Sequence, residues 1–256
     1  MLKFLLTPKW IALTVITILL QPSFYLLSQW QWHRLHERQT LNSSILSNEQ
    51  QQAITLEAAL QGVQPQTSPT LSLDNSMQWR SVSITGKWDT EHQVLVRRQT
   101  YESNLGFWVV TPMRDTFGNV LLVNRGWIPA SSSALSTPTV QSPPSDTVTM
   151  TGRIRIVKPR TNVKPQDLPA RQVDQIQPLE VLQDKQLIGN AYAELITSNP
   201  ESRTSDLSPI LPPEISEGPH RSYAWQWMIF AIMTISGYLI LVRKELLLHH
   251  KIDTEK

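Results

Sequence analysis

The chain has 256 residues, a formal net charge of +2 and no cysteine. So small a charge, with no basic tract in the middle of the chain, argues against a nucleic-acid partner. The lack of cysteine excludes disulfide bonds, thiolate metal sites and thiol catalysis. Apolar residues gather near the two ends, whereas the middle is rich in Gln, Ser, Thr and Pro.

The two apolar segments have the length and composition of transmembrane helices. Residues 10–27 (WIALTVITILLQPSFYLL) and 223–242 (YAWQWMIFAIMTISGYLILV) carry no charged side chain, and a helix needs about 20 apolar residues to cross the hydrocarbon core. A cleaved signal peptide is the alternative for the first segment, because Lys3 and Lys9 precede it, but no small-x-small cleavage site follows. We therefore expect an uncleaved helix at each end.

Basic residues flank both segments on the side of the chain termini. Two lysines precede the first segment, and residues 243–251 (RKELLLHHK) follow the second. Since basic flanks stay in the cytoplasm, we expect residues 1–9 and 243–256 to be cytoplasmic and residues 28–222 to form an extracytoplasmic, periplasmic domain. The expected location is the plasma (inner) membrane, as a multi-pass protein, with the lipid bilayer as a partner.

From residue 79 onward apolar and polar residues alternate with a period of two, which predicts β-strands. The expected strands are 79–88, 93–98, 107–113, 119–125, 148–157 and 190–196. Residues 115–119 (DTFGN) have the composition of a hairpin turn. The fold class that follows is a membrane protein with two terminal transmembrane α-helices flanking an antiparallel β-rich (α+β) extracytoplasmic domain.

Shorter segments connect these elements. Residues 29–52 continue the first helix, and Thr55 is placed to cap a short helix over 56–61. Residues 173–183 form a second short helix. Residues 198–219, rich in Pro and Ser, are expected to form a flexible tether that leads back to the second apolar segment.

Motifs of known catalytic sites do not occur in the chain. Hydrolase, zinc-protease, P-loop and dinucleotide-binding signatures are all missing, and the acidic residues are scattered singly through expected turns. We therefore expect that the protein is not an enzyme.

Aromatic, basic and histidine residues mark the outer end of each apolar segment. Trp30 and Arg34 are four residues apart and share a helix face, while His220 lies one turn before Tyr223 and Ala224. Anchoring at the lipid headgroups explains the Trp and Arg residues, and a solvated polar residue explains a single histidine. A ligand role for His220 is the alternative.

Five blocks in chain order resemble the surfeit locus protein 1 family. They are Trp30-Gln31-x-x-Arg34; Trp79-Arg80 with Gly86-x-Trp88; Gly106-Phe107-Trp108-Val109-Val110-Thr111-Pro112; residues 118–129 (GNVLLVNRGWIP); and His220-x-x-Tyr223-Ala224-x-x-Trp227. The resemblance runs from about residue 10 to 245 and is thinnest over 160–215. The family usually has Gly ahead of the Trp-Gln pair, where this chain has Ser28.

This resemblance implies a chaperone of the respiratory chain, an assembly factor for haem–copper cytochrome c oxidase. Its expected cargo is haem a, and its expected partners are the catalytic subunit of the oxidase and haem a synthase. His220 matches the histidine linked to haem in the family, which makes it the expected axial ligand of the haem iron. Tyr223 also matches a family position.

Further haem contacts are proposed on chemical grounds alone. Anionic propionates at the outer face would find planar guanidinium partners in Arg34, Arg125 and Arg221, and Trp227 would pack on the porphyrin beside Tyr223. His33 and His36 share a helix face, so a copper or second haem site is conceivable, but with no third ligand we prefer solvated residues.

Two alternatives remain open. In the first, the protein docks beside the oxidase without haem, and His220 is incidental. In the second, it is a polysaccharide chain-length regulator, since such proteins also have two terminal spans and a Pro-rich stretch like residues 209–219. The outer domain of a regulator consists mainly of long helices, which the period-two pattern over 79–157 disfavours.

Overall fold

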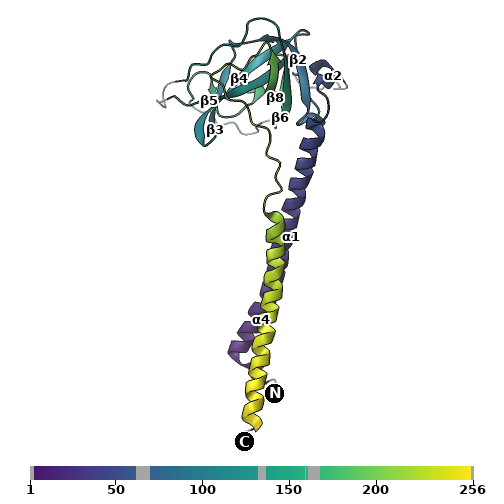
Figure 1. Cartoon of the computed structure of the whole chain (residues 1–256), viewed down its shortest axis with the longest axis vertical. Coiled ribbons are helices and arrows are strands. Elements are labelled where there is room, and N and C mark those ends of the chain that lie inside the picture. The colour runs from purple at the N-terminus through teal and green to yellow at the C-terminus, as the bar shows by residue number, and fades with distance from the viewer. Residues whose placement is uncertain (1–2, 62–69, 132–136, 159, 161–167, 255–256) are drawn as a thin grey trace. The chain divides into compact units, whose positions relative to one another are not determined.

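The computed structural model describes residues 3–61, 70–131, 137–158, 160 and 168–254. The chain divides into two compact units. A helical unit holds residues 1–43 and 214–256, and a sheet unit holds residues 44–213. Figure 1 shows the long helices of the first and the strands of the second.

The helical unit consists of a short 3-10 helix, η1 (Lys3–Leu6), and two long helices, α1 (Pro8–Glu49) and α4 (His220–Thr254). Each long helix contains one of the apolar segments. Their most apolar windows have mean hydropathies of 1.8 and 1.6, and both helices are long and apolar enough to cross a membrane. As expected, α1 continues well past residue 27, and it does so with Pro22 inside it.

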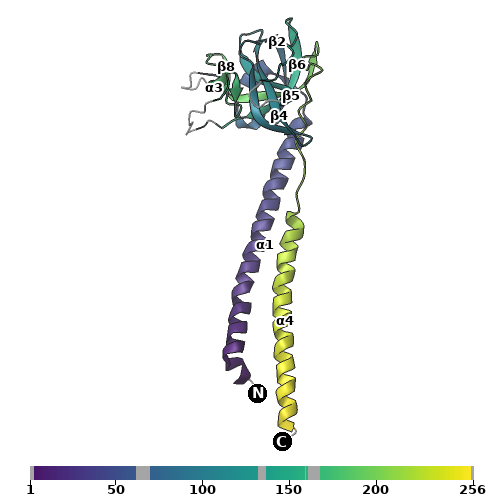
Figure 2. The same ribbon diagram turned by 90° about the vertical axis from the view of Figure 1, so that its left-hand side faces the viewer.

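The two long helices run antiparallel and side by side (Figure 2). Residues early in α1 contact residues late in α4, and residues later in α1 contact the start of α4. The contacts that fix this register are Thr14 Oγ1 to Tyr238 Oη at 2.8 Å, the stacked rings of Phe24 and Trp227 at 6.1 Å, and Ser28 Oγ to the Ala224 carbonyl at 3.1 Å.

The described residues of the sheet unit form eight strands and two short α-helices. In chain order its elements are β1 (Ile54–Thr55), α2 (Leu56–Leu60), η2 (Asn75–Met77), β2 (Ser81–Trp88), β3 (Val94–Tyr101), β4 (Asn104–Asp115), β5 (Val120–Pro129), β6 (Val148–Ile156), β7 (Gln172–Val173), α3 (Pro178–Val181) and β8 (Leu187–Asn199). Every expected strand is present, with ends that differ by a few residues. The cap on α2 is also confirmed, because Thr55 Oγ1 accepts the N–H of Ala58 at 3.1 Å.

The strands form one mixed sheet in the order β1-β2-β6-β8-β5-β4-β3-β7. An additional pairing of β2 with β4 closes the five strands β2, β6, β8, β5 and β4 into a ring. The expectation of an antiparallel sheet is therefore only partly correct, because β1–β2, β3–β7 and β5–β8 pair in parallel. A sheet-rich unit also contradicts the long outer helices that the chain-length regulator would require.

Ring closure depends on a close approach of two backbones at Gly86. A Cβ at this position would lie 2.0 Å from the carbonyl oxygen of Arg114, so only glycine fits where β2 meets β4. All five ring strands contribute to the larger core cluster, with Val82, Leu121 and Val123 among its fully buried members. Leu122 belongs to a second cluster, so β5 is buried on both faces.

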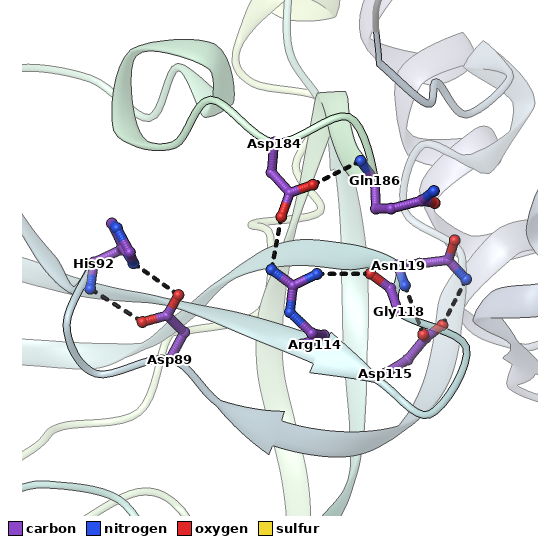
Figure 3. A network of polar contacts seen from close by, with 8 residues as sticks. All are labelled: Asp89, His92, Arg114, Asp115, Gly118, Asn119, Asp184 and Gln186. Carbon is purple, nitrogen blue, oxygen red and sulfur yellow. Dashed lines mark hydrogen bonds and ion pairs between the residues drawn. The ribbon is translucent and has the colours of Figure 1, made fainter.

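The β4–β5 hairpin turns where the sequence predicts it. Asp115 Oδ1 accepts the N–H groups of Phe117 and Asn119, both at 2.8 Å, and holds the chain in a tight turn. Figure 3 shows the contact between Asp115 and Asn119. Arg114, beside it, donates to the Gly118 carbonyl at 2.9 Å and to Asp184 Oδ2 at 2.6 Å. This arginine therefore ties the turn to the loop that precedes β8.

Two expectations about the second half of the sheet unit need correction. The helix expected over 173–183 is only the single turn α3, because Val173 belongs to β7 and pairs with Val96. The expected tether over 198–219 is packed in its first half. Ser202 and Leu207 are buried, and Ser208 exchanges two backbone hydrogen bonds of 2.8 Å with Trp127.

Candidate functional site

His220 is the first residue of α4, and it contacts α1 through a hydrogen bond. Its Nδ1 atom lies 2.9 Å from Oε1 of Gln31. The Gln31 side chain is only 8% exposed, while His220 is half-buried. Gln31 Oε1 can only accept, so this contact is a hydrogen bond when Nδ1 carries the proton.

This hydrogen bond leaves the second ring nitrogen available as a ligand. With the proton on Nδ1, a neutral imidazole keeps its lone pair on Nε2. In the part of the chain that the structure describes, Nε2 has no hydrogen-bond partner. An imidazole held in this way has the form in which histidine binds a metal.

The two aromatic residues expected beside His220 differ in their surroundings. Tyr223 is 46% exposed and leaves its ring accessible. Trp227 stacks on Phe24 of α1 and meets Phe230 edge-on at 5.8 Å, so it contributes to helix packing. Its Nε1 atom is buried and has no hydrogen-bond partner among the described residues, which leaves one donor unused.

Of the three expected arginines, Arg34 and Arg221 belong to the helical unit, and both are exposed. Arg34 forms an ion pair of 2.6 Å with Glu37 one turn further along α1. Arg221 lines an open pocket of about 470 Å³ together with Trp32, Leu35, His36 and Gln39. Arg221 is therefore more available than Arg34 to bind an anionic ligand.

Arg125 lies in the sheet unit and is a structural residue. Its side chain is fully buried, and it donates to the Ser202 carbonyl through Nε at 3.1 Å and Nη2 at 2.8 Å and to Gln93 Oε1 through Nη1 at 3.1 Å. Burial lowers the pKa of Arg125 to about 10, opposed by the charge of Asp206. With no exposed donor for a propionate, Arg125 is removed from the expected haem contacts.

The His33 and His36 side chains have separate surroundings. His33 is largely exposed, and its Nε2 lies 3.2 Å from Glu37 Oε1, whereas His36 lines the pocket with Arg221. Within the described ranges, no group of three or more His, Asp or Glu side chains could hold a metal ion.

The sheet unit has a pocket of its own, of about 410 Å³, lined by Val96, Trp108, Tyr192 and neighbouring residues. Burial raises the pKa of Tyr192 to about 12, with Arg155 opposing the shift. The phenol therefore stays protonated at physiological pH and offers neither a base nor an anionic ligand. This environment gives no reason to place the site in the sheet unit.

Two residues at the candidate site were missed by reasoning from sequence. Gln31 stands inside the block Trp30-Gln31-x-x-Arg34, but the pattern gives it no role, because its partner is His220, 189 residues away. Gly218 precedes His220 with φ at +64°. Its position before a helix would have indicated a turn, but only the structure shows that a Cβ at residue 218 would contact the imidazole ring.

Comparisons with known proteins cover nearly the whole chain. A family model described as the SURF1 family matches residues 18–232, which include about half of each apolar segment and the whole sheet unit. The chain is also similar to an uncharacterized SURF1-like protein of Mycobacterium bovis and to one of Mycobacterium tuberculosis. Each is 30% identical over 245 residues, which span 92% of this chain and 84% of the relative. The chain belongs to the SURF1 family.

Proposed function

We propose that this protein is a membrane-bound assembly factor for haem–copper cytochrome c oxidase that holds haem a for insertion into the catalytic subunit. The observation that carries the proposal is the family match over residues 18–232. The family is the surfeit locus protein 1 family that the sequence blocks resemble. In this proposal the protein catalyses no reaction, and haem a is its cargo.

Insertion into a membrane is supported by the surfaces of α1 and α4. The most apolar windows of the two helices are 6% and 0% buried, unlike a core helix of a soluble protein. Large apolar side chains, such as Ile18, Leu19, Ile232 and Ile240, are more than half exposed. In water such surface would be costly at about 25 cal/mol per Å², whereas a bilayer would cover it.

Haem a would fit the chemistry at the start of α4. The free Nε2 of His220 is suited to bind an iron axially, and the exposed ring of Tyr223 offers a flat surface. Arg221, and Arg34 once released from Glu37, would pair with propionates. The macrocycle is largely apolar, so the adjoining helix surfaces would suit it. Haem a synthase is the proposed donor and the catalytic subunit the recipient.

The proposed orientation has both termini in the cytoplasm and the sheet unit in the periplasm. It is tested with single cysteines, since the chain has none of its own. T90C lies at an exposed position of the sheet unit, and K244C lies beyond the apolar part of α4. A membrane-impermeant maleimide should label T90C in cells with a permeable outer membrane and leave K244C unlabelled. The reverse pattern would refute the orientation.

The role in assembly is tested by deletion and complementation. Membranes of a deletion strain should contain less active oxidase and less oxidase-bound haem a than the parent strain. Wild-type protein should restore both, and so should Ser28→Ala, whereas His220→Ala should restore little. Full oxidase activity and haem content in the deletion strain would refute the proposal.

The haem-free docking protein differs from the proposed carrier in two measurable respects. If the protein only docks beside the oxidase, His220→Ala should complement the deletion fully, and the purified protein should contain no haem. No structural observation favours docking alone, because the hydrogen bond to Gln31 leaves Nε2 of His220 unpartnered among the described residues.

A further inference from the structure

We propose that Gln31 is a positioning residue that fixes the tautomer of His220, so that Nε2 is presented to the haem iron, and that Gly218 keeps this edge of the ring open. The inference rests on the proposed haem-carrier function. It assigns roles to two residues for which the sequence blocks suggest none.

The first support is the geometry of the Gln31–His220 pair. The amide oxygen lies 2.9 Å from Nδ1, and the Gln31 side chain is almost fully buried between the helices. A buried amide has few other partners, so the hydrogen bond also holds the ring in one orientation. Histidines that bind metals almost always donate their other N–H to such an acceptor, which raises the basicity of the ligating nitrogen.

The second support is the position of Gly218. Its φ of +64° belongs to the left-handed region, where glycine is favoured. A Cβ added at this position would lie 3.5 Å from Nε2 and 3.4 Å from Cδ2 of His220. Any side chain at residue 218 would therefore stand against the edge of the ring that carries the free lone pair. Glycine keeps that approach clear.

Nitrogen-15 NMR of histidine-labelled, full-length protein in detergent tests the tautomer without haem. The signals of His220 are assigned by their loss in His220→Ala. At a pH at which the ring is neutral, wild type should show the Nδ1–H tautomer. Gln31→Leu, which removes the acceptor, should shift His220 toward the Nε2–H form that free imidazoles prefer. A wild-type His220 protonated on Nε2 would overturn the inference, whether or not the protein binds haem.

Titration with haem a, with iron protoporphyrin IX as a second probe, tests the consequence for binding. Loss of the acceptor in Gln31→Leu should weaken binding by about 10- to 100-fold and raise the midpoint potential of the bound iron. Gln31→Glu keeps an acceptor and makes it anionic, so it should retain binding and lower the potential. A merely structural role for Gln31 would not produce opposite shifts of the potential.

Two further variants make the test specific. Ser28→Ala removes the hydrogen bond from Ser28 to the Ala224 carbonyl, one turn from Gln31, without touching His220, and should leave affinity and potential unchanged. Gly218→Asn, with a residue that tolerates positive φ, should weaken haem binding while leaving the tautomer of His220 unchanged.

The outcomes separate this inference from the proposed function. If His220→Ala loses haem while Gln31→Leu matches wild type in affinity and potential, the inference on Gln31 is wrong and the haem-carrier proposal stands. If wild type binds neither probe, the haem-carrier proposal is wrong, and the NMR result alone decides the tautomer. Unchanged haem affinity in Gly218→Asn would overturn the role of Gly218.

Discussion

Arg125 lies in one of the sequence blocks that resemble the family, residues 118–129, and it stabilises the fold. It is fully buried and holds two segments on the sheet through its donors, because it bonds the carbonyls of Ser202 and, at 3.4 Å, Gln141. Its guanidinium also lies 5.9 Å from the ring centroid of Trp88. Arg125 therefore contributes, through Ser202, to the packing of residues 198–208.

We therefore predict that Arg125→Met destabilises the protein by about 2 to 3 kcal/mol, because buried acceptors lose their charged donor. Arg125→Lys should be intermediate, since an ammonium group cannot match the fork of donors. Thermal unfolding of full-length protein in detergent, followed by near-ultraviolet circular dichroism, measures the effect. Exposed Arg38 provides the control, and Arg38→Met should change stability by less than about 0.5 kcal/mol. Equal effects at both positions would contradict the assignment.

Asp184 is predicted to make the stability of the sheet unit depend on pH. The hydrogen bond from Arg114 is the main cause that lowers the pKa of Asp184 below its ordinary value of 3.8. A lowered pKa stabilises the fold above pH 3.8, and that contribution is lost as pH falls through the folded-state pKa. Asp184→Asn should therefore lower the free energy of unfolding at neutral pH, by less than about 1 kcal/mol, because Arg114 is exposed and Asp184 only half-buried.

Denaturant unfolding of wild type and Asp184→Asn over a series of pH values checks this prediction. The difference between the two proteins should shrink as the solution becomes more acidic than pH 3.8. A difference that stays constant into strong acid would show that the ion pair between Arg114 and Asp184 does not contribute.

At the scale of elements, α1 and α4 come close at Ser28. Ser28 is 1% exposed and Ala224 is fully buried, so two small residues face each other between the helices, as is common for helices that pack in membranes. Ser28 adds a hydrogen bond to the Ala224 carbonyl.

We predict that Ser28→Gly preserves the helix pair and that Ser28→Leu forces the helices apart, at a cost of about 1 to 3 kcal/mol from overpacking. The cysteine-free chain allows spin labels at Leu26 and Ile229, both exposed apolar positions on the two helices. Electron–electron double resonance should give a longer or broader distance distribution for Ser28→Leu alone. Identical distributions in all three proteins would refute the close contact.

Local patterns predicted individual elements well and their partners less well. Alternation marks β2, in which every second residue is buried, whereas β5 is buried on both faces. Asp115 marks the hairpin because its carboxylate caps the turn. The parallel pairing of β5 with β8 joins distant segments, and no local pattern encodes it. The strand β7 is too short to show a period, and the helix expected over 173–183 includes its second residue, Val173.

At the scale of the whole molecule, the division into a helical unit and a sheet unit follows from composition, because the apolar runs stand at the two ends. The position of His220 at the start of α4 was also predictable. Its hydrogen bond to Gln31 was not, since the register between two helices nearly 190 residues apart depends on packing. Arg125 was expected from sequence to contact haem, but the folded sheet buries its side chain fully.

The central claim is that His220 holds haem a, and the most direct measurement is the haem a content of the purified, full-length protein. The protein is isolated in detergent from cells that make haem a, and haem per chain is determined by the pyridine haemochrome method. Wild type and His33→Ala, a control at an exposed histidine, should carry haem a, and His220→Ala should lose most of it. Haem-free wild type, or full haem retention in His220→Ala, would contradict the claim.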